Sequence, residues 1–245
     1  MDLISIIILI LTILFVLILL VKRFLYFHPS KTLQPFIENF QEIYEGNLHG
    51  LFLGDEKATK IILYCHGNAG NVSTRQEKMI NLNKMGFSVL IFDYSGYGKS
   101  KGVPNERLCY HSGDVFMAYL LRNGFSKEDI VLYGESLGAS VATYLAIKYG
   151  VKTLILESPL PSIKSLLRCY SPLLAVLGLI FNEFDTESMI KAFNGRLLLI
   201  HSVHDEVIPF SSINKLKLKA EKVIETVGGH NTIEIDWNQI KEFLS

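Results

Sequence analysis

Short apolar runs alternate with longer amphipathic stretches along most of this chain, and the alternation restricts the fold to one class. The candidate strands are Leu48–Leu53, Ile61–Cys65, Val89–Phe92, Ile130–Tyr133, Thr153–Leu156, Leu197–Ile200 and, more weakly, Val223–Val227. Runs that are apolar on both faces are typical of buried parallel strands. The stretches near 72–85, 105–122, 137–149, 211–221 and 234–244 are predicted helices. The pattern predicts an α/β domain with a mostly parallel sheet and helices on both faces.

The composition excludes several other classes. The 245 residues carry 24 Lys+Arg and 24 Asp+Glu, so the formal net charge is zero and lacks the basic excess that is typical of nucleic-acid-binding proteins. Aromatic residues make up 11% of the chain, which is too many for a disordered protein. Three cysteines in a chain of this length do not form a disulfide framework. The length fits one domain, predicted over 24–245, behind a separate N-terminal segment over 1–23.

The N-terminal segment is strongly apolar. Between Leu3 and Val21, 17 of 19 residues are aliphatic or Phe, and Ser5 and Thr12 are the exceptions. A helix of 19 residues is about 28 Å long, close to the thickness of a hydrocarbon core. A signal peptide would have a basic start and a small-residue cleavage site, and a core helix would have a polar face. We therefore expect a single transmembrane helix that acts as a signal anchor.

The charges beside this segment predict its orientation. Lys22 and Arg23 follow the apolar stretch, and Phe24, Tyr26 and Phe27 after them suggest an interfacial aromatic belt. The positive-inside rule then places the large domain in the cytosol, which suits three free thiols at Cys65, Cys109 and Cys169. Each thiol is expected to behave as a small buried hydrophobic group. The one Asn-x-Ser/Thr sequence, at Asn71, is expected to be unglycosylated.

Residues 159–190 form a longer connection than an ordinary crossover. Nine apolar residues follow Pro172, a length that is too short to span a membrane. Two interpretations remain open. The segment is a buried crossover helix, or it has a functional role, as a lid over an apolar pocket or as a surface that rests on a membrane.

The motif Gly134-Glu-Ser136-Leu-Gly138 has the Gly-x-Ser-x-Gly pattern of a nucleophile elbow. It follows the candidate strand Ile130–Tyr133 and precedes a helix rich in small residues. A sharp turn between strand and helix exposes the serine hydroxyl above the sheet, and the bare pattern is informative only in this context. Ser136 is therefore the candidate nucleophile.

A serine hydroxyl needs a base and an acid that orients the base. Asp205 follows the candidate strand Leu197–Ile200 and is the preferred acid, with Glu206 and Glu157 as alternatives. His230 follows two glycines after the last candidate strand and is the preferred base. His201 and His204 are expected to be structural, and no metal site is predicted. His28, His49 and His111 stand outside any motif.

The oxyanion of acyl transfer needs two hydrogen-bond donors. The elbow offers the backbone N–H of Leu137, and the glycine-containing loop after Ile61–Cys65 offers the amide of Asn68. His66, in the same loop, is expected to shape the loop rather than to act as a base.

Taken together, these motifs resemble the Bem46-like group of serine α/β-hydrolases, which includes α/β-hydrolase domain-containing proteins 13 and 17. The resemblance rests on six segments that occur in order: His66–Asn71, Phe92–Ser100, the elbow, Glu157-Ser-Pro, the loop from His201 to Pro209, and Gly228-Gly-His230. It implies that Ser136, Asp205 and His230 form a triad. It also implies hydrolysis of esters or thioesters of lipid-like acyl substrates without a cofactor.

Two functions of different class follow. The first is an active membrane-anchored serine esterase or thioesterase, whose partners are an acylated or small-molecule substrate and a membrane. The second is a catalytically silent α/β-hydrolase domain that binds a lipid or a partner protein. The complete set of three triad residues favours the first. The sequence carries no signal for the oligomeric state.

Overall fold

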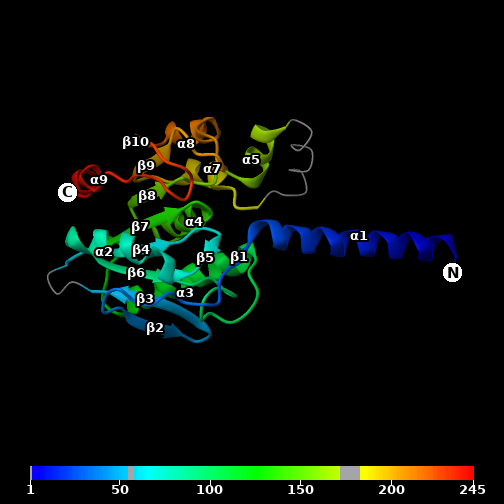
Figure 1. The fold of residues 1–245 in the computed structure, drawn as a ribbon, viewed down its shortest axis with the longest axis horizontal. Coiled ribbons are helices and arrows are strands. Elements are labelled where there is room, and N and C mark those ends of the chain that lie inside the picture. The colour runs from blue at the N-terminus through cyan, green and yellow to red at the C-terminus, as the bar shows by residue number, and fades with distance from the viewer. Residues whose placement is uncertain (1, 55–57, 172–182) are drawn as a thin grey trace.

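An eight-stranded mixed sheet runs through the domain, in the order β10-β9-β8-β7-β4-β6-β3-β2. This arrangement comes from a computed structural model that describes residues 2–54, 58–171 and 183–245 (Figure 1). Six neighbouring strands are parallel, and the antiparallel strands β3 and β2 complete one edge. The strands are β2 (Gln41–Glu45), β3 (Leu48–Leu53), β4 (Ile61–Cys65), β6 (Ser88–Phe92), β7 (Ile130–Glu135), β8 (Thr153–Glu157), β9 (Arg196–Ser202) and β10 (Lys222–Thr226). The prediction of a mostly parallel α/β sheet is confirmed.

Alternating side chains of the central strands divide between two cores. In β4, Ile61 and Leu63 belong to one core, and Ile62 and Tyr64 belong to the other. The first core also contains apolar side chains of α3 (Glu106–Arg122), α4 (Gly138–Tyr149) and α8 (Asn214–Lys217). The second contains those of α2 (Gln76–Lys84) and α9 (Trp237–Leu244). Helices therefore cover both faces of the sheet, as strands that are apolar on both faces require.

The helix ends follow local chemistry that the sequence carries. The side chain of Asn105 accepts a hydrogen bond from the Leu108 N–H and caps the start of α3. Asp236 caps α9 in the same way. At the other end of α4, Gly150 adopts φ 74°, the left-handed conformation that ends many helices.

The first helix, α1 (Leu3–Tyr26), projects away from the domain, and the N- and C-termini lie at opposite ends of the molecule (Figure 1). Within the part of the chain whose placement is described, no helix is both long enough and apolar enough to cross a bilayer. The side chains of 3, 14–15 and 17–25 lie outside that description. The transmembrane span predicted over Leu3–Val21 is therefore not confirmed.

The base of α1 corrects one interpretation of the sequence. Tyr26 and Phe27 were expected in an interfacial aromatic belt, but both are 9% exposed and belong to the first core. The ring of Phe27 packs edge-on against that of Phe184, with ring centroids 6.0 Å apart. These two aromatic residues therefore fix the end of the helix to the domain.

Several elements differ from the predictions. The helix expected over 211–221 is two short pieces, η3 (Phe210–Ile213) and α8, and α8 ends at Lys217. The connection predicted over 159–190 contains α5 (Ile163–Tyr170), α7 (Thr186–Met189) and η2 (Ile190–Ala192). Residues 172–182, on which both interpretations of that connection depend, lie outside the described residues. Cys169 is exposed rather than buried, whereas Cys65 and Cys109 are buried.

Candidate active site

The turn from β7 to α4 holds Ser136 in a strained conformation. Its φ is 52°, in the left-handed region that costs a non-glycine residue about 1–3 kcal/mol. Backbone hydrogen bonds over-determine this conformation, because the Ser136 N–H donates to the Glu157 carbonyl at 2.9 Å and its own carbonyl accepts from Ala139 and Leu160 at 3.1 Å. The turn is the nucleophile elbow that the motif predicts.

The two glycines of the motif are needed because the backbone approaches too closely for a side chain. A Cβ atom on Gly134 would lie 2.6 Å from the Cα of Ala139. On Gly138 it would lie 2.1 Å from the carbonyl oxygen of Cys65, at the end of β4. The elbow can therefore sit directly against the carboxyl end of the neighbouring strand.

Ser136, His230 and Asp205 form one continuous hydrogen-bonded chain. The Ser136 Oγ lies 3.0 Å from the His230 Nε2, and the His230 Nδ1 lies 2.8 Å from the Asp205 Oδ2. The imidazole hydrogen on Nδ1 is assigned from the carboxylate that accepts it, which leaves Nε2 to accept from the hydroxyl. All three residues predicted for the triad are brought together in the order that general-base catalysis requires.

The two adjacent acids have different partners. Asp205 also accepts hydrogen bonds from the N–H groups of Val207 and Ile208 through Oδ1. Burial alone would raise the pKa of Asp205, but the hydrogen bonds from the His230 ring and the Ile208 N–H outweigh it and hold the pKa below its usual value. Glu206 accepts instead from the backbone N–H of His230, at 3.0 Å. Asp205 is therefore placed as the orienting acid and Glu206 as a support for the loop.

The third candidate acid, Glu157, lies away from the imidazole. Its carboxylate contacts Lys78 at 2.5 Å and accepts a hydrogen bond from the Tyr133 hydroxyl at 2.6 Å. It is 1% exposed. This alternative to Asp205 is therefore not part of the triad geometry.

The loop that carries Asn68 lies close to the elbow. A Cβ atom on Gly67 would lie 3.4 Å from that of Ser136. The Asn68 carbonyl accepts hydrogen bonds from the Tyr97 hydroxyl at 2.7 Å and the His28 N–H at 3.0 Å. Among the described residues, no hydrogen bond occupies the N–H of Leu137, the other predicted oxyanion donor. Both predicted donor positions are thus on loops that border the nucleophile.

A short strand after α1 braces this loop. Strand β1 (His28–Pro29) pairs in parallel with β5 (Ala69–Gly70), and the Ser30 N–H donates to the Gly70 carbonyl at 2.9 Å. Neither strand was predicted, because two residues are too few to show a periodic pattern. The segment that joins α1 to the domain is therefore also a support for the predicted oxyanion loop.

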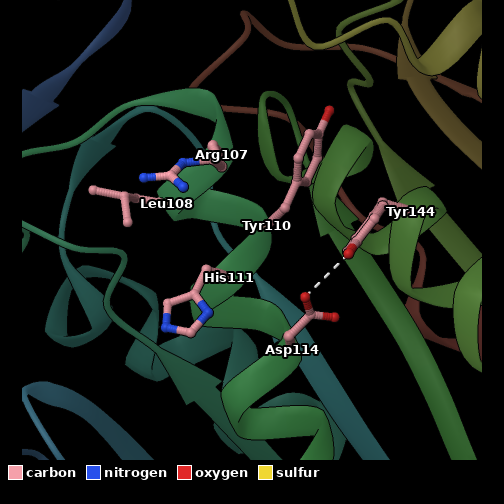
Figure 2. A pocket seen from close by; sticks show the side chains of 6 residues that line it. All are labelled: Arg107, Leu108, Tyr110, His111, Asp114 and Tyr144. Carbon is pink, nitrogen blue, oxygen red and sulfur yellow. Dashed lines mark hydrogen bonds between the residues drawn. The ribbon is translucent and has the colours of Figure 1, made fainter.

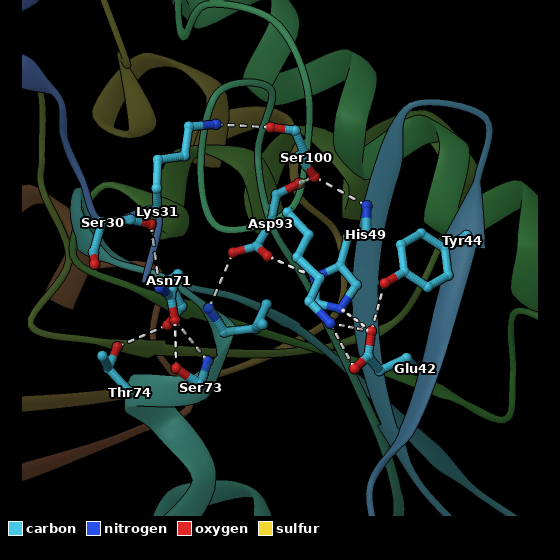
Figure 3. Close-up of polar contacts among 12 residues, drawn as sticks. Ser30, Lys31, Glu42, Tyr44, His49, Asn71, Ser73, Thr74, Asp93 and Ser100 are labelled. Atoms are coloured by element: carbon cyan, nitrogen blue, oxygen red, sulfur yellow. Dashed lines mark hydrogen bonds and ion pairs between the residues drawn. The ribbon is translucent and has the colours of Figure 1, made fainter. Parts of the chain in front are cut away.

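Asn71 ends the same loop, and both the nitrogen and the oxygen of its side-chain amide form hydrogen bonds (Figure 3). Its amide Nδ2 donates to the carbonyls of Ser30 at 3.1 Å and Thr32 at 2.8 Å, and its Oδ1 accepts from the N–H and the hydroxyl of Ser73. The residue is completely buried. A folded chain therefore offers no amide at Asn71 for a glycan, on either side of a membrane.

Asp93, also drawn in Figure 3, joins this region to the antiparallel edge of the sheet. Its carboxylate accepts from the Val72 N–H at 3.0 Å and contacts the His49 Nδ1 at 2.8 Å, and both side chains are fully buried. The other nitrogen of His49 faces Glu42, with 3.4 Å between them. His49 stood outside any motif in the sequence, and the structure gives it a bracing role.

Of the other histidines near the site, His66 and His201 are buried, whereas His204, which was also expected to be structural, is exposed. His66 is fully buried, its Nδ1 lies 2.7 Å from the Gly67 carbonyl, and burial lowers its pKa to about 4. His201 is buried, with its Nε2 2.9 Å from the Ile208 carbonyl, and burial lowers its pKa too. Among the described residues, no group of three or more His, Cys, Asp or Glu could hold a metal ion.

Four charged residues pair behind the elbow, and this pairing was not predicted from the sequence. Arg75 and Lys78, from η1 (Val72–Arg75) and α2, pair with Glu135 and Glu157 at the carboxyl ends of β7 and β8. A signal was present, since an acid ends each of two adjacent buried strands. Buried carboxylates need cationic partners, but nothing in the pattern indicated which basic residues would meet them.

A cavity of about 450 Å³ lies over α3 and α4, apart from these residues (Figure 2). The Tyr110 and Tyr144 rings stack there with centroids 4.7 Å apart, and Asp114 accepts from the Tyr144 hydroxyl at 3.0 Å. Its lining residues are Arg107, Leu108, Tyr110, His111, Asp114 and Tyr144. These contacts join the two helices, and none involves a predicted site residue.

Comparisons with known proteins agree with the fold. A family described as alpha/beta hydrolase fold matches residues 60–207, more than half of the chain. An esterase of Pyrococcus furiosus superposes with a TM-score of 0.70 at 19% identity, over 89% of this chain and 97% of that one. At that identity the superposition establishes a shared fold alone.

Two curated relatives are similar in sequence. Human α/β-hydrolase domain-containing protein 17C is 33% identical over 193 residues, which cover 75% of this chain and 57% of that protein. An uncharacterized protein of Mycobacterium tuberculosis H37Rv is 33% identical over 181 residues, which cover 71% of this chain and 64% of that one. The chain therefore spans less than two thirds of the length of both relatives. On these similarities, and on the strand–elbow–helix arrangement around Ser136, the chain belongs to the α/β-hydrolase fold family, among the relatives of domain-containing protein 17C.

Proposed function

We propose that this protein is a serine hydrolase that cleaves carboxylic ester or thioester bonds of acyl substrates. The observation that carries the proposal is the hydrogen-bonded chain from Ser136 through His230 to Asp205, which begins on a strained elbow. Such a chain activates a hydroxyl that is otherwise a weak nucleophile. The family match supports hydrolysis as the class of reaction.

In the first half-reaction, the Ser136 hydroxyl attacks the acyl carbonyl carbon and passes its proton to the His230 Nε2. The carbonyl oxygen becomes an oxyanion, which the backbone N–H groups of Leu137 and Asn68 are placed to stabilise. The imidazolium is stabilised by Asp205, whose pKa lies below its usual value so that it stays ionised. His230 then gives the proton to the departing alkoxide or thiolate, and an acyl-serine remains.

In the second half-reaction, water replaces the departed alcohol or thiol. His230 takes a proton from the water as its oxygen attacks the acyl-serine. The tetrahedral intermediate then collapses, and His230 returns the proton to the Ser136 oxygen. The balance is one ester or thioester and one water in, one carboxylic acid and one alcohol or thiol out. This chemistry uses side chains and backbone donors alone, with no cofactor.

A fluorophosphonate probe tests the proposal, because it reacts with an activated serine. We expect the wild-type chain to be labelled and Ser136→Ala not to be, with ester turnover lowered by about 10⁴ or more. Ser140, which lies on α4 and is fully buried, serves as a control, since Ser140→Ala should leave labelling intact. A folded wild-type chain that resists the probe and turns over no ester would favour a silent, binding domain instead.

We further propose that α1 anchors the enzyme to a membrane, with the domain in the cytosol and with lipid-like acyl chains as substrates. Apolar side chains on the described part of α1 support this, because they are 42% to 70% exposed: Ile4, Ile6, Ile7, Ile8, Leu9, Ile10, Leu11, Ile13 and Val16. An exposed apolar surface of this extent is unfavourable in water and is typical of a surface that binds a membrane or a partner.

The preferred acyl-chain length can be measured separately, with a panel of p-nitrophenyl esters from acetate to palmitate.

A further inference from the structure

We infer that Arg75 is a positioning residue that holds the oxyanion loop, residues 66–70, in register with the nucleophile elbow. The inference rests on the proposed function. Arg75 contacts both structures. Its Nη1 donates to the Ala69 carbonyl in the loop at 2.7 Å, and its Nη2 donates to the Glu135 Oε1 in the elbow at 2.6 Å. The Nε donates to the other Glu135 oxygen at 3.3 Å.

The elbow end of this bridge is held firmly. Besides Arg75, Glu135 accepts a hydrogen bond from the Tyr64 hydroxyl at 2.6 Å and contacts Lys78 at 3.2 Å. Both the Arg75 and the Glu135 side chains are 12% exposed. Burial alone would raise the pKa of Glu135, but Arg75 and Lys78 outweigh it and hold the pKa well below its usual range. Glu135 therefore stays ionised and offers the guanidinium a fixed partner.

A second acid ties the same group to the serine backbone. Lys78 bridges Glu135 to Glu157, whose carboxylate also accepts from the Tyr133 hydroxyl at 2.6 Å. The backbone carbonyl of Glu157 accepts the Ser136 N–H at 2.9 Å. The two carboxylates, of Glu135 and Glu157, balance the charges of Arg75 and Lys78, so the group of four has no net charge.

The loop end packs against the same guanidinium. A Cβ atom on Gly67 would lie 3.0 Å from the Glu135 Oε1, 3.4 Å from the Arg75 Nη2 and 3.4 Å from the Ser136 Cβ. Gly67 therefore lies between the Arg75–Glu135 ion pair and Ser136, with no room for a larger side chain. Movement of the arginine would remove the support that the loop receives on the side of the elbow.

Positioning is a better explanation of this group than stability. Apolar side chains of similar volume often replace a buried ion pair with no loss of stability. The two predicted oxyanion donors, in contrast, lie on separate loops and must converge on one oxygen atom. A misplacement of about 1 Å can cost about 100-fold in rate, and loss of one oxyanion donor costs about 10²–10³-fold.

The test compares Arg75→Met with Lys78→Met. Both remove one cation from the buried group, but only Arg75 contacts the loop. We expect Arg75→Met to lower kcat by about 100-fold with KM changed less than about threefold. It should weaken binding of a trifluoromethyl ketone, which forms the oxyanion, by a similar factor. Lys78→Met should lower kcat by less than about fivefold, although it should lower the thermal stability of the protein as much as Arg75→Met does.

Hydrogen exchange at the amides of 67–71 gives a readout that needs no turnover. Exchange there should accelerate in Arg75→Met and not in Lys78→Met. Equal kcat losses in the two variants, or unchanged exchange in Arg75→Met, would overturn the inference. If Arg75→Met does not fold, Arg75→Lys, which keeps the charge but has one terminal nitrogen in place of the fork that reaches both Glu135 and Ala69, should show the same changes. Failure of the proposed function would be seen separately, as a wild-type chain that does not react with a fluorophosphonate.

Discussion

Asp205 and Glu206 are neighbours in sequence but contact different atoms of His230. Asp205 contacts the ring nitrogen Nδ1, and Glu206 contacts the backbone N–H. Asp205→Asn should lower kcat by about 10⁴-fold, because an amide there no longer holds the required tautomer. Glu206→Gln should lower it by less than about tenfold, because a glutamine oxygen still accepts from the backbone. Steady-state kinetics of the two folded variants decide between the acids, and the reverse ranking would contradict the triad.

His66 gives a pH dependence of stability with a definite sign. Burial lowers its pKa in the folded state to about 4, from an unfolded value near 6.5. The stability that a neutral His66 allows is fully present above about pH 6.5 and is lost as the pH falls toward 4. Between pH 7.5 and pH 5 this loss is about 2 kcal/mol. Urea unfolding of the wild type and of His66→Asn at both pH values measures it. Identical pH slopes for the two proteins would show that His66 is not the group responsible.

The elements of the fold were predictable to different extents from the chain. Strands such as Ile61–Cys65 stood out, because they are buried on both faces and so carry a continuous apolar run. The pair of β1 and β5 did not, because its hydrogen bonds join two dipeptides about 40 residues apart. The predicted helix over 211–221 ends early at Lys217, where the polypeptide turns to enter β10. Periodicity reports burial along one element and carries no information on which distant segment pairs with it.

The β1–β5 pair predicts a sharp truncation boundary. A chain that begins at Phe27 keeps the hydrogen bonds of His28 and Ser30 to the oxyanion loop, whereas one that begins at Leu33 loses them. We expect the first to retain kcat within about twofold and the second to lose about tenfold or more, because the loop that carries Asn68 is then supported on one side only. Ester kinetics of the two purified proteins test this. Equal kcat values would show that the strand does not support the loop.

At the scale of the whole molecule, the proposed membrane anchor predicts that the full chain and a chain from Phe27 fractionate differently. The full chain should remain in the membrane pellet after alkaline extraction, and the shorter chain should be soluble. Apolar side chains that are about half exposed along α1 are the physical reason. A full chain that is released by alkali would contradict an embedded anchor.

The side of the membrane needs a probe other than glycosylation. The amide of Asn71, in the one Asn-x-Ser/Thr sequence, is buried and hydrogen-bonded, so a correctly folded chain lacks a glycan there on either side of the membrane. Cys169 is exposed, and the other two cysteines are buried. A membrane-impermeant maleimide should label Cys169 when the plasma membrane alone is permeabilised. Labelling that requires the internal membranes to be opened would place the domain in the lumen, and Cys169→Ser is the control.

The spacing of the triad along the chain sets the order in which a newly made molecule can become active. Ser136 and His230 are 94 residues apart, while the brace between β1 and β5 closes over about 40 residues. Domains generally fold as units, and Ser136 and His230 belong to one domain, so Ser136 acquires its base only after synthesis has passed His230. On the proposed mechanism, a chain whose synthesis stops between Asp205 and His230 would carry the serine without its base and would not hydrolyse an acyl substrate.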